Sequence, residues 1–189
     1  SVWNVREGMA EPGRWYLDRS RGTIVYRPLP GEDIAALDVL APTVESLIRI
    51  EGTEAAPVRG LSIRGLGLTV TTTPLTAGGF GARAFDGAVS AAFAHDSTLS
   101  GLRIFNVAGQ GIKETGSRGL IVERCEIRDT GACGIVAGDG RKTLRGNVIR
   151  RVGAIYPSAI GVSCNGGRGG EGTRVVGNTI EETPYSAVA

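Results

Sequence analysis

An internal repeat constrains this chain more than any other feature of its sequence. Apolar residues recur at successive spacings of 36, 23, 22 and 31 positions, at Leu68, Ile104, Ile127, Ile149 and Ile180. The position five residues earlier is also apolar in every repeat, at Ile63, Leu99, Val122, Leu144 and Val175. A unit of about 22 residues cannot bury its own inner face, so successive units must stack on one another.

Two asparagines occupy equivalent positions in the last two repeats. The column that lies two residues before the reference position contains Leu66, Leu102, Cys125, Asn147 and Asn178. Parallel stacking places equivalent residues about 4.8 Å apart, so the two amides are expected to form a short hydrogen-bonded ladder inside one corner. Cys125 shares this column and is expected to be a small core residue rather than a nucleophile.

A second apolar column follows the reference position by eight residues. It contains Ile112, Ile135 and Val188, and a three-residue insertion would bring Ile160 into it. The preceding residue is small in each repeat, at Gly111, Gly134, Ala159 and Ala187. We therefore expect two short strands per repeat, separated by a glycine-rich corner such as residues 129–131.

These patterns predict an all-β protein, a right-handed parallel β-helix with an N-terminal β-hairpin insert. Residues 1–40 form the insert, in which 15–18 pair with 23–26, and residues 41–189 form the coils. Residues 71–94 and 165–172 interrupt the repeat as surface excursions. The chain stops in the middle of a coil without a cap, which indicates a fragment of a longer solenoid. Leucine-rich repeats and propellers fit the pattern less well.

Composition narrows the range of partners. The net charge of +2 favours neither nucleic acid nor an anionic membrane, and no apolar run reaches a membrane span. The chain has three cysteines, Cys125, Cys133 and Cys164, and a single histidine, so we expect no metal site and no cofactor.

Several segments resemble a known family. Residues 11–19, 22–26 and 30–33 resemble the insert that precedes the main helix in large bacterial right-handed parallel β-helix repeat-containing proteins of the pectate-lyase-like superfamily. Residues 178–186 resemble a frequent coil ending of the same proteins. The resemblance covers nearly the whole chain. It implies an extracellular or periplasmic carbohydrate-active protein whose partner is a polysaccharide or oligosaccharide. Several members of the group are glycoside hydrolases with paired carboxylates, so the resemblance implies this activity first.

Glycoside hydrolysis requires two carboxyl groups, about 5 Å apart for retention and about 6.5–9.5 Å apart for inversion. Two residues after the reference position lie Asn106, Asp129, Arg151 and Glu182. Asp129 and Glu182 are two repeats apart, about 9.6 Å if stacking is regular, and form the candidate catalytic pair. Arg151 lies between them as a structural bridge or a substrate contact, and it would lower the pKa of both carboxyls. The alternative is a surface charge ladder.

Other residues offer weaker signals. His95 and Asp96 suggest a base and its orienting partner, but neighbouring strand residues point to opposite faces, which favours a turn role. Glu114 and Asp139 follow the second column and are expected to line one groove. Tyr156 and Tyr185 precede matched strands and are candidates for stacking on sugar rings or for packing. A polysaccharide lyase, which would need clustered acidic calcium ligands, and a non-catalytic carbohydrate-binding or adhesin scaffold are the alternative functions.

Overall fold

A computed structural model describes residues 4–164 and 172–189, in two compact units, Ser1–Leu40 and Ala41–Ala189. The first unit contains the predicted hairpin, in which β1 (Trp15–Asp18) pairs antiparallel with β2 (Thr23–Tyr26). Two short 3-10 helices flank it, η1 (Arg6–Ala10) and η2 (Ile34–Ala36). The Asn4 side chain accepts a hydrogen bond from the Leu17 amide at 2.7 Å and donates one to the Leu17 carbonyl.

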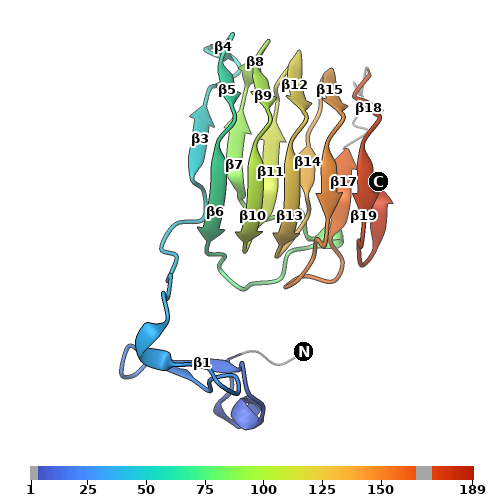
Figure 1. Ribbon diagram of the computed structural model, residues 1–189. Helices are drawn as coiled ribbons and strands as arrows, with labels where there is room; N and C mark the ends of the chain where they lie inside the picture. The colour runs from blue at the N-terminus through green and yellow to red at the C-terminus, as the bar shows by residue number, and fades with distance from the viewer. Residues whose placement is uncertain (1–3, 165–171) are drawn as a thin grey trace. The chain divides into compact units, whose positions relative to one another are not determined.

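The second unit is a right-handed parallel β-helix, as the repeat predicts (Figure 1). Successive strands visit three parallel sheets in turn. Sheet I contains β5 (Ser62–Arg64), β9 (Thr98–Ser100), β12 (Leu120–Glu123), β15 (Lys142–Arg145) and β18 (Arg174–Val176). Sheet II contains β6 (Gly67–Thr71), β10 (Arg103–Val107), β13 (Glu126–Thr130), β16 (Val148–Arg150) and β19 (Thr179–Glu181). Sheet III contains β3 (Ile48–Glu51), β7 (Gly87–Ala92), β11 (Gln110–Thr115), β14 (Ile135–Ala137), β17 (Ile160–Cys164) and β20 (Ser186–Val188).

The two apolar columns of the repeat stack in the predicted register. Each reference residue pairs with the next along sheet II, in the order Leu68, Ile104, Ile127, Ile149 and Ile180. The earlier column pairs in the same way along sheet I, in the order Ile63, Leu99, Val122, Leu144 and Val175. The inner coils bury these residues completely, and the columns form one continuous core.

Each full coil has three strands rather than the two that the sequence suggested. The two columns lie on different sheets, because the chain turns through a left-handed residue between them. This residue has positive φ in every coil, at Gly65, Gly101, Arg124, Gly146 and Gly177. Glycine adopts positive φ without the steric cost that other residues meet, so the recurring glycine was the signal for this corner.

The register of sheet III corrects one predicted position. Val162, not Ile160, pairs with Ile135 and with Val188, so the insertion in this coil is five residues long. The glycine before it explains the choice. A Cβ atom at Gly161 would lie 2.5 Å from Cγ2 of Ile180, the reference residue of the next repeat, and Gly111 and Gly134 meet the isoleucines of their next repeats equally closely. The column therefore needs Gly161, which Ala159 cannot replace.

The asparagine ladder is confirmed inside the corner between sheets I and II. Asn147 is completely buried, and its Nδ2 donates to Asn178 Oδ1 at 2.9 Å and to the Val122 carbonyl at 3.0 Å. Its Oδ1 accepts from the Cys125 amide at 3.0 Å. Asn178 continues the ladder by donating to the Leu144 carbonyl at 2.8 Å. Cys125 lies in the core, as expected.

A long excursion connects β6 to β7 and is shorter than predicted, because β7 already begins at Gly87. It carries the short 3-10 helix η3 (Phe80–Ala82) and runs along the coils toward β17 (Figure 1). Its residues Ala82 and Phe85 form a second apolar cluster with Cys133, Val136 and Ile160. We call residues 72–86 the strap. The predicted excursion at 165–172 falls almost entirely outside the described residues.

One short parallel pair, β4 (Val58–Arg59) with β8 (Ala94–His95), completes the strands. Among residues 4–164 and 172–189, no helix is long and apolar enough to cross a membrane.

Candidate functional site

The column of the predicted catalytic pair lies at the bend between sheets II and III. Its residues have positive φ in every coil: Val70, Asn106, Asp129, Arg151 and Glu182. Asp129, Arg151 and Glu182 therefore occupy equivalent positions in three consecutive coils, as predicted. Arg151 binds Asp129 in a bidentate manner, with Nε 2.7 Å from Oδ1 and Nη2 3.1 Å from Oδ2. Arg128 donates a further bond to Oδ2 at 2.6 Å.

These arginines define what Asp129 can do. Arg151, followed by Arg128, lowers the pKa of Asp129 to about 2 against the opposing effect of burial. Asp129 is therefore ionised at neutral pH and has no proton to donate, which a general acid must have. Glu182 lies two coils beyond Asp129, and its side chain is exposed. For Asp129 and Arg151 the geometry favours the charge ladder, and a catalytic role for Asp129 with Glu182 stays a prediction.

The Asp129 ion pair carries a testable pH dependence. Its pKa in the folded protein lies below the usual 3.8, so its stabilising effect is complete above about pH 4 and is lost as the pH falls toward 2. We expect Asp129→Asn to lower the free energy of unfolding by about 1 kcal/mol at pH 7, since solvent screens part of the attraction. In urea denaturation the difference between the variant and the wild type should shrink steadily as the pH is lowered from 4 to 2. Glu182→Gln is the control, and an equal loss in both variants would contradict the ion-pair account.

The two candidate tyrosines differ in their surroundings. Tyr156 stacks on Phe85 of the strap, with ring centroids 4.1 Å apart and an interplanar angle of 24°. It is half-buried and packs against the second apolar cluster, so it serves packing. Tyr185 is 58% exposed and meets Phe80, itself 73% exposed, edge to face at 6.1 Å. The strap thus brings together two exposed rings from distant parts of the sequence.

His95 and Asp96 do not contact each other. His95 Nδ1 accepts a hydrogen bond from the Arg118 amide at 3.2 Å. The Asp96 carboxylate lies 3.4 Å from Arg59, and Asp96 has a φ of 48° at a corner. Asp96 therefore has the predicted turn role, whereas His95 ends strand β8.

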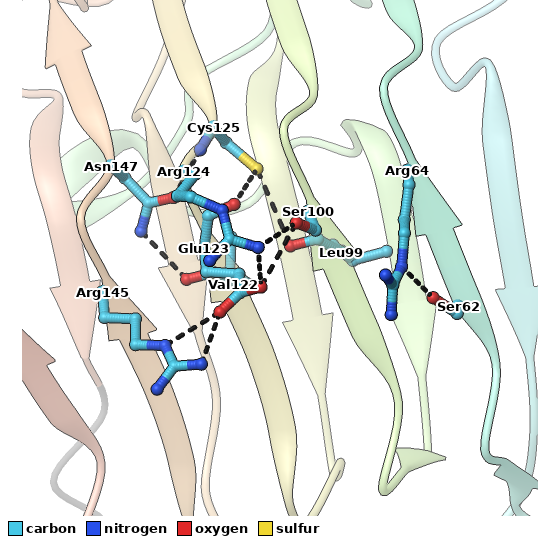
Figure 2. A network of polar contacts seen from close by, with 10 residues as sticks. All are labelled: Ser62, Arg64, Leu99, Ser100, Val122, Glu123, Arg124, Cys125, Arg145 and Asn147. Carbon is cyan, nitrogen blue, oxygen red and sulfur yellow. Dashed lines mark hydrogen bonds and ion pairs between the residues drawn. The ribbon is translucent and has the colours of Figure 1, made fainter.

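A polar network on sheet I was not anticipated from the sequence (Figure 2). The Glu123 side chain is 8% exposed and accepts from Arg145 Nε and Nη2 at 2.8 and 2.6 Å. Arg124 and Ser100 bind its other oxygen, Oε1. The Arg145 hydrogen bonds lower the pKa of Glu123. Arg124 is the non-glycine residue of the first corner column, where a left-handed backbone costs about 1 kcal/mol.

A hollow of about 440 Å³ lies over sheet III beside the strap. The strap contributes Gly78, Gly79, Phe80, Arg83 and Ala84, and the coils contribute Lys113, Glu114, Thr115, Val136, Gly138 and Asp139. Lys113 Nζ donates to the Ala84 carbonyl at 3.0 Å, which ties the coil to the strap. The Asp139 side chain is exposed at the rim. Glu114 and Asp139 both border this hollow, which contains neither Asp129 nor Glu182.

The Glu114 carboxylate, however, belongs to a buried ion pair. Its Oε2 lies 2.7 Å from Lys142 Nζ, and the two side chains are 2% and 0% exposed. Lys142 also donates to the carbonyls of Gly138, Asp139 and Gly140. Burial lowers the pKa of Lys142 to about 8, so the ammonium is still protonated at neutral pH. The pair fixes the turn at the edge of the hollow from inside the coil.

Within the described ranges, no group of three or more His, Cys, Asp or Glu side chains is placed to hold a metal ion. The lining of the hollow combines one exposed ring, Phe80, with charged side chains of both signs, and Tyr185 contacts Phe80 edge to face. The protein is thus a parallel β-helix with a hollow over one of its three sheets.

Comparison with family models shows which family of β-helix proteins the chain belongs to. The model of the right-handed β-helix region matches residues 46–185, so the chain belongs to that family. No curated protein and no solved structure is significantly similar to the chain.

Proposed function

We propose that this chain is part of a secreted carbohydrate-active protein, extracellular or periplasmic, that binds a polysaccharide or oligosaccharide at the hollow on sheet III. The right-handed β-helix family includes carbohydrate-active enzymes, which agrees with the resemblance of the insert and the coil ending. The observation that carries the proposal is an exposed pair of rings: Phe80 lines the hollow, and Tyr185 meets Phe80 edge to face at 6.1 Å.

Exposed aromatic rings suit a sugar ligand for a physical reason. A sugar ring has apolar C–H faces that pack on the face of an aromatic ring, while its hydroxyl groups remain free for hydrogen bonds. Two exposed rings in contact beside a hollow offer a larger apolar surface than a single exposed ring does. Phe80 and Tyr185 provide the apolar contact, and Lys113 and Asp139 provide a donor and an acceptor for hydroxyl groups. Such a mixture of apolar lining and few polar groups is typical of small-ligand sites.

The rigidity of the support also favours binding. The strap is fixed to the coils by Gln110 Nε2, which donates to the Ala82 carbonyl at 2.6 Å, and by the stacking of Phe85 on Tyr156. Phe80 therefore lies two residues before an anchored stretch of the strap, and a ligand would need to order little of that stretch on binding.

Glycoside hydrolysis stays the proposed reaction of the whole protein, with polysaccharide lysis or a purely binding scaffold as alternatives. It requires one protonated and one ionised carboxyl group across the scissile bond. Asp129 can fill only the ionised role, because Arg151 and Arg128 keep it deprotonated. Binding is therefore the part of the function that the described coils support best.

The test is a calorimetric binding screen against neutral and acidic plant and bacterial oligosaccharides. We expect Phe80→Ala and Tyr185→Ala each to weaken the binding of a positive ligand about tenfold, the loss of one aromatic contact. Both side chains are largely exposed, so the variants should fold normally. Trp15→Ala is the matched control, because Trp15 is an aromatic residue of the hairpin unit that is 62% exposed. Unchanged affinity in the Phe80→Ala, Tyr185→Ala double variant would overturn the proposal.

A further inference from the structure

A second hollow, of about 320 Å³, lies on the outer face of sheet II. Gly67, Thr69, Arg103, Ile104, Phe105, Glu126 and Arg128 line it. Two neighbouring columns produce its shape. Gly67 is in register with Arg103 and then Glu126, and Thr69 is in register with Phe105 and then Arg128. Small residues on β6 thus lie beside long side chains on β10 and β13, which leaves a space about two coil steps long.

The charges around this hollow are mainly positive. The Arg128 guanidinium lies over the Phe105 ring, 4.7 Å from the ring centroid. It also forms an ion pair with Asp129, in which Nη1 lies 2.6 Å from Oδ2. Glu126 is the acidic residue of the lining, and it is shared by Arg150 at 2.8 Å and Arg128 at 3.5 Å. Arg103 is exposed, and no ion pair or hydrogen bond engages its guanidinium within residues 4–164 and 172–189. The hollow therefore offers one immobilised guanidinium and one available guanidinium.

Thr69 supplies an independent observation. Its Oγ1 is buried at the hollow and has no hydrogen-bond partner among the described residues. A buried hydroxyl group without a partner costs free energy, and native proteins seldom leave one unpaired without a reason. An acceptor oxygen of a ligand in the hollow would accept a hydrogen bond from the Thr69 hydroxyl. The same ligand would face Arg103 and Arg128.

We propose that the hollow on sheet II binds an oxyanion, a carboxylate or sulfate group. Arg103 and Arg128 provide charge-assisted hydrogen bonds, and the Thr69 hydroxyl donates a third. Arg150 holds the Glu126 carboxylate at the side and reduces its repulsion of the ligand. This inference does not rest on the proposed function, because the hollow lies on a different sheet from Phe80 and Tyr185.

Gly67 allows a sharp test. It has an ordinary backbone conformation, and a Cβ atom there would meet nothing within 4 Å, so a side chain can extend into the hollow without strain. We would titrate sodium sulfate and sodium glucuronate separately, at constant ionic strength, and measure binding by calorimetry. Glucose, which has no charge, is the ligand control. We expect saturable millimolar binding of at least one anion, and which of the two binds identifies the group.

Variants of the protein distinguish a specific anion site from nonspecific attraction of anions to a positively charged surface. Gly67→Glu should abolish anion binding, and Arg103→Gln should weaken it at least tenfold. Thr179→Glu is the matched control. Thr179 lies farther along sheet II in the same column as Gly67, so the substitution adds the same charge outside the hollow. It should retain the affinity of the wild type, as should Phe80→Ala. The inference is overturned if neither anion binds saturably, or if Gly67→Glu and Thr179→Glu bind equally well.

Discussion

Replacement of Ile127 by alanine is expected to lower the free energy of unfolding by about 2–5 kcal/mol. Ile127 is completely buried between Ile104 and Ile149 of the neighbouring coils. Its Cγ2 methyl occupies the space beside Gly111, where a Cβ atom would lie only 2.5 Å away. Because this packing repeats along the helix, the coils can relax little around the cavity. Urea denaturation of the wild type and the variant measures the loss.

Ile121 provides the matched control for this change. It lies on β12, half-buried, and alternates with the inward residues Leu120 and Val122. The same replacement by alanine there should cost clearly less, because most of the side chain does not enter the core. A loss well below 1 kcal/mol for Ile127→Ala, or equal losses for the two variants, would contradict the inward packing of sheet II.

Glu114→Gln is expected to lower stability by about 3–5 kcal/mol, because it leaves the Lys142 ammonium buried without a counter-charge. The side chains of this pair are 2% and 0% exposed, and the ammonium lies 2.7 Å from the carboxylate. Glutamine keeps the size of the side chain, so the effect reports charge rather than volume. Glu11→Gln is the control, since Glu11 forms an ion pair with Arg14 in which both side chains are mostly exposed. It should cost less than about 1 kcal/mol.

A double-mutant cycle separates the pair from its surroundings. Lys142→Met should also destabilise the protein, because the carbonyls of Gly138, Asp139 and Gly140 lose their donor. In the double variant both charges are gone, so its loss should be smaller than the sum of the two single losses by at least about 2 kcal/mol. Additive losses would show that Glu114 and Lys142 do not stabilise each other.

The sequence specifies the core of this fold because inward residues must be apolar in every coil. Ile104, Ile127 and Ile149 show that requirement directly, and Asn147 with Asn178 shows its polar equivalent. The third strand of each coil was missed because its corner is marked only by a backbone conformation. Four coils use glycine there, but Arg124 occupies the same left-handed position in the remaining, middle coil, which hides the column.

The candidate site was harder to predict because it depends on segments outside the repeat. Phe80 and Tyr185 meet only because the strap crosses several coils, and no periodic spacing encodes its path. Tyr185 was nevertheless a candidate, since it precedes a matched strand. The Asp129 and Glu182 column was placed correctly, but the sequence could not show how closely Arg151 and Arg128 bind Asp129. Ion-pair geometry of this kind appears only when the side chains are positioned.

The most direct test of the central claim is an NMR titration of the isotope-labelled protein with an oligosaccharide that binds. The chain has a mass of 19.6 kDa, which suits amide chemical-shift mapping. If the hollow on sheet III binds the sugar, the largest shifts will fall on Gly79, Phe80, Lys113, Asp139 and Tyr185. If these amides remain unchanged while the shifts cluster around Asp129, Arg151 and Glu182, the binding surface has been assigned to the wrong face.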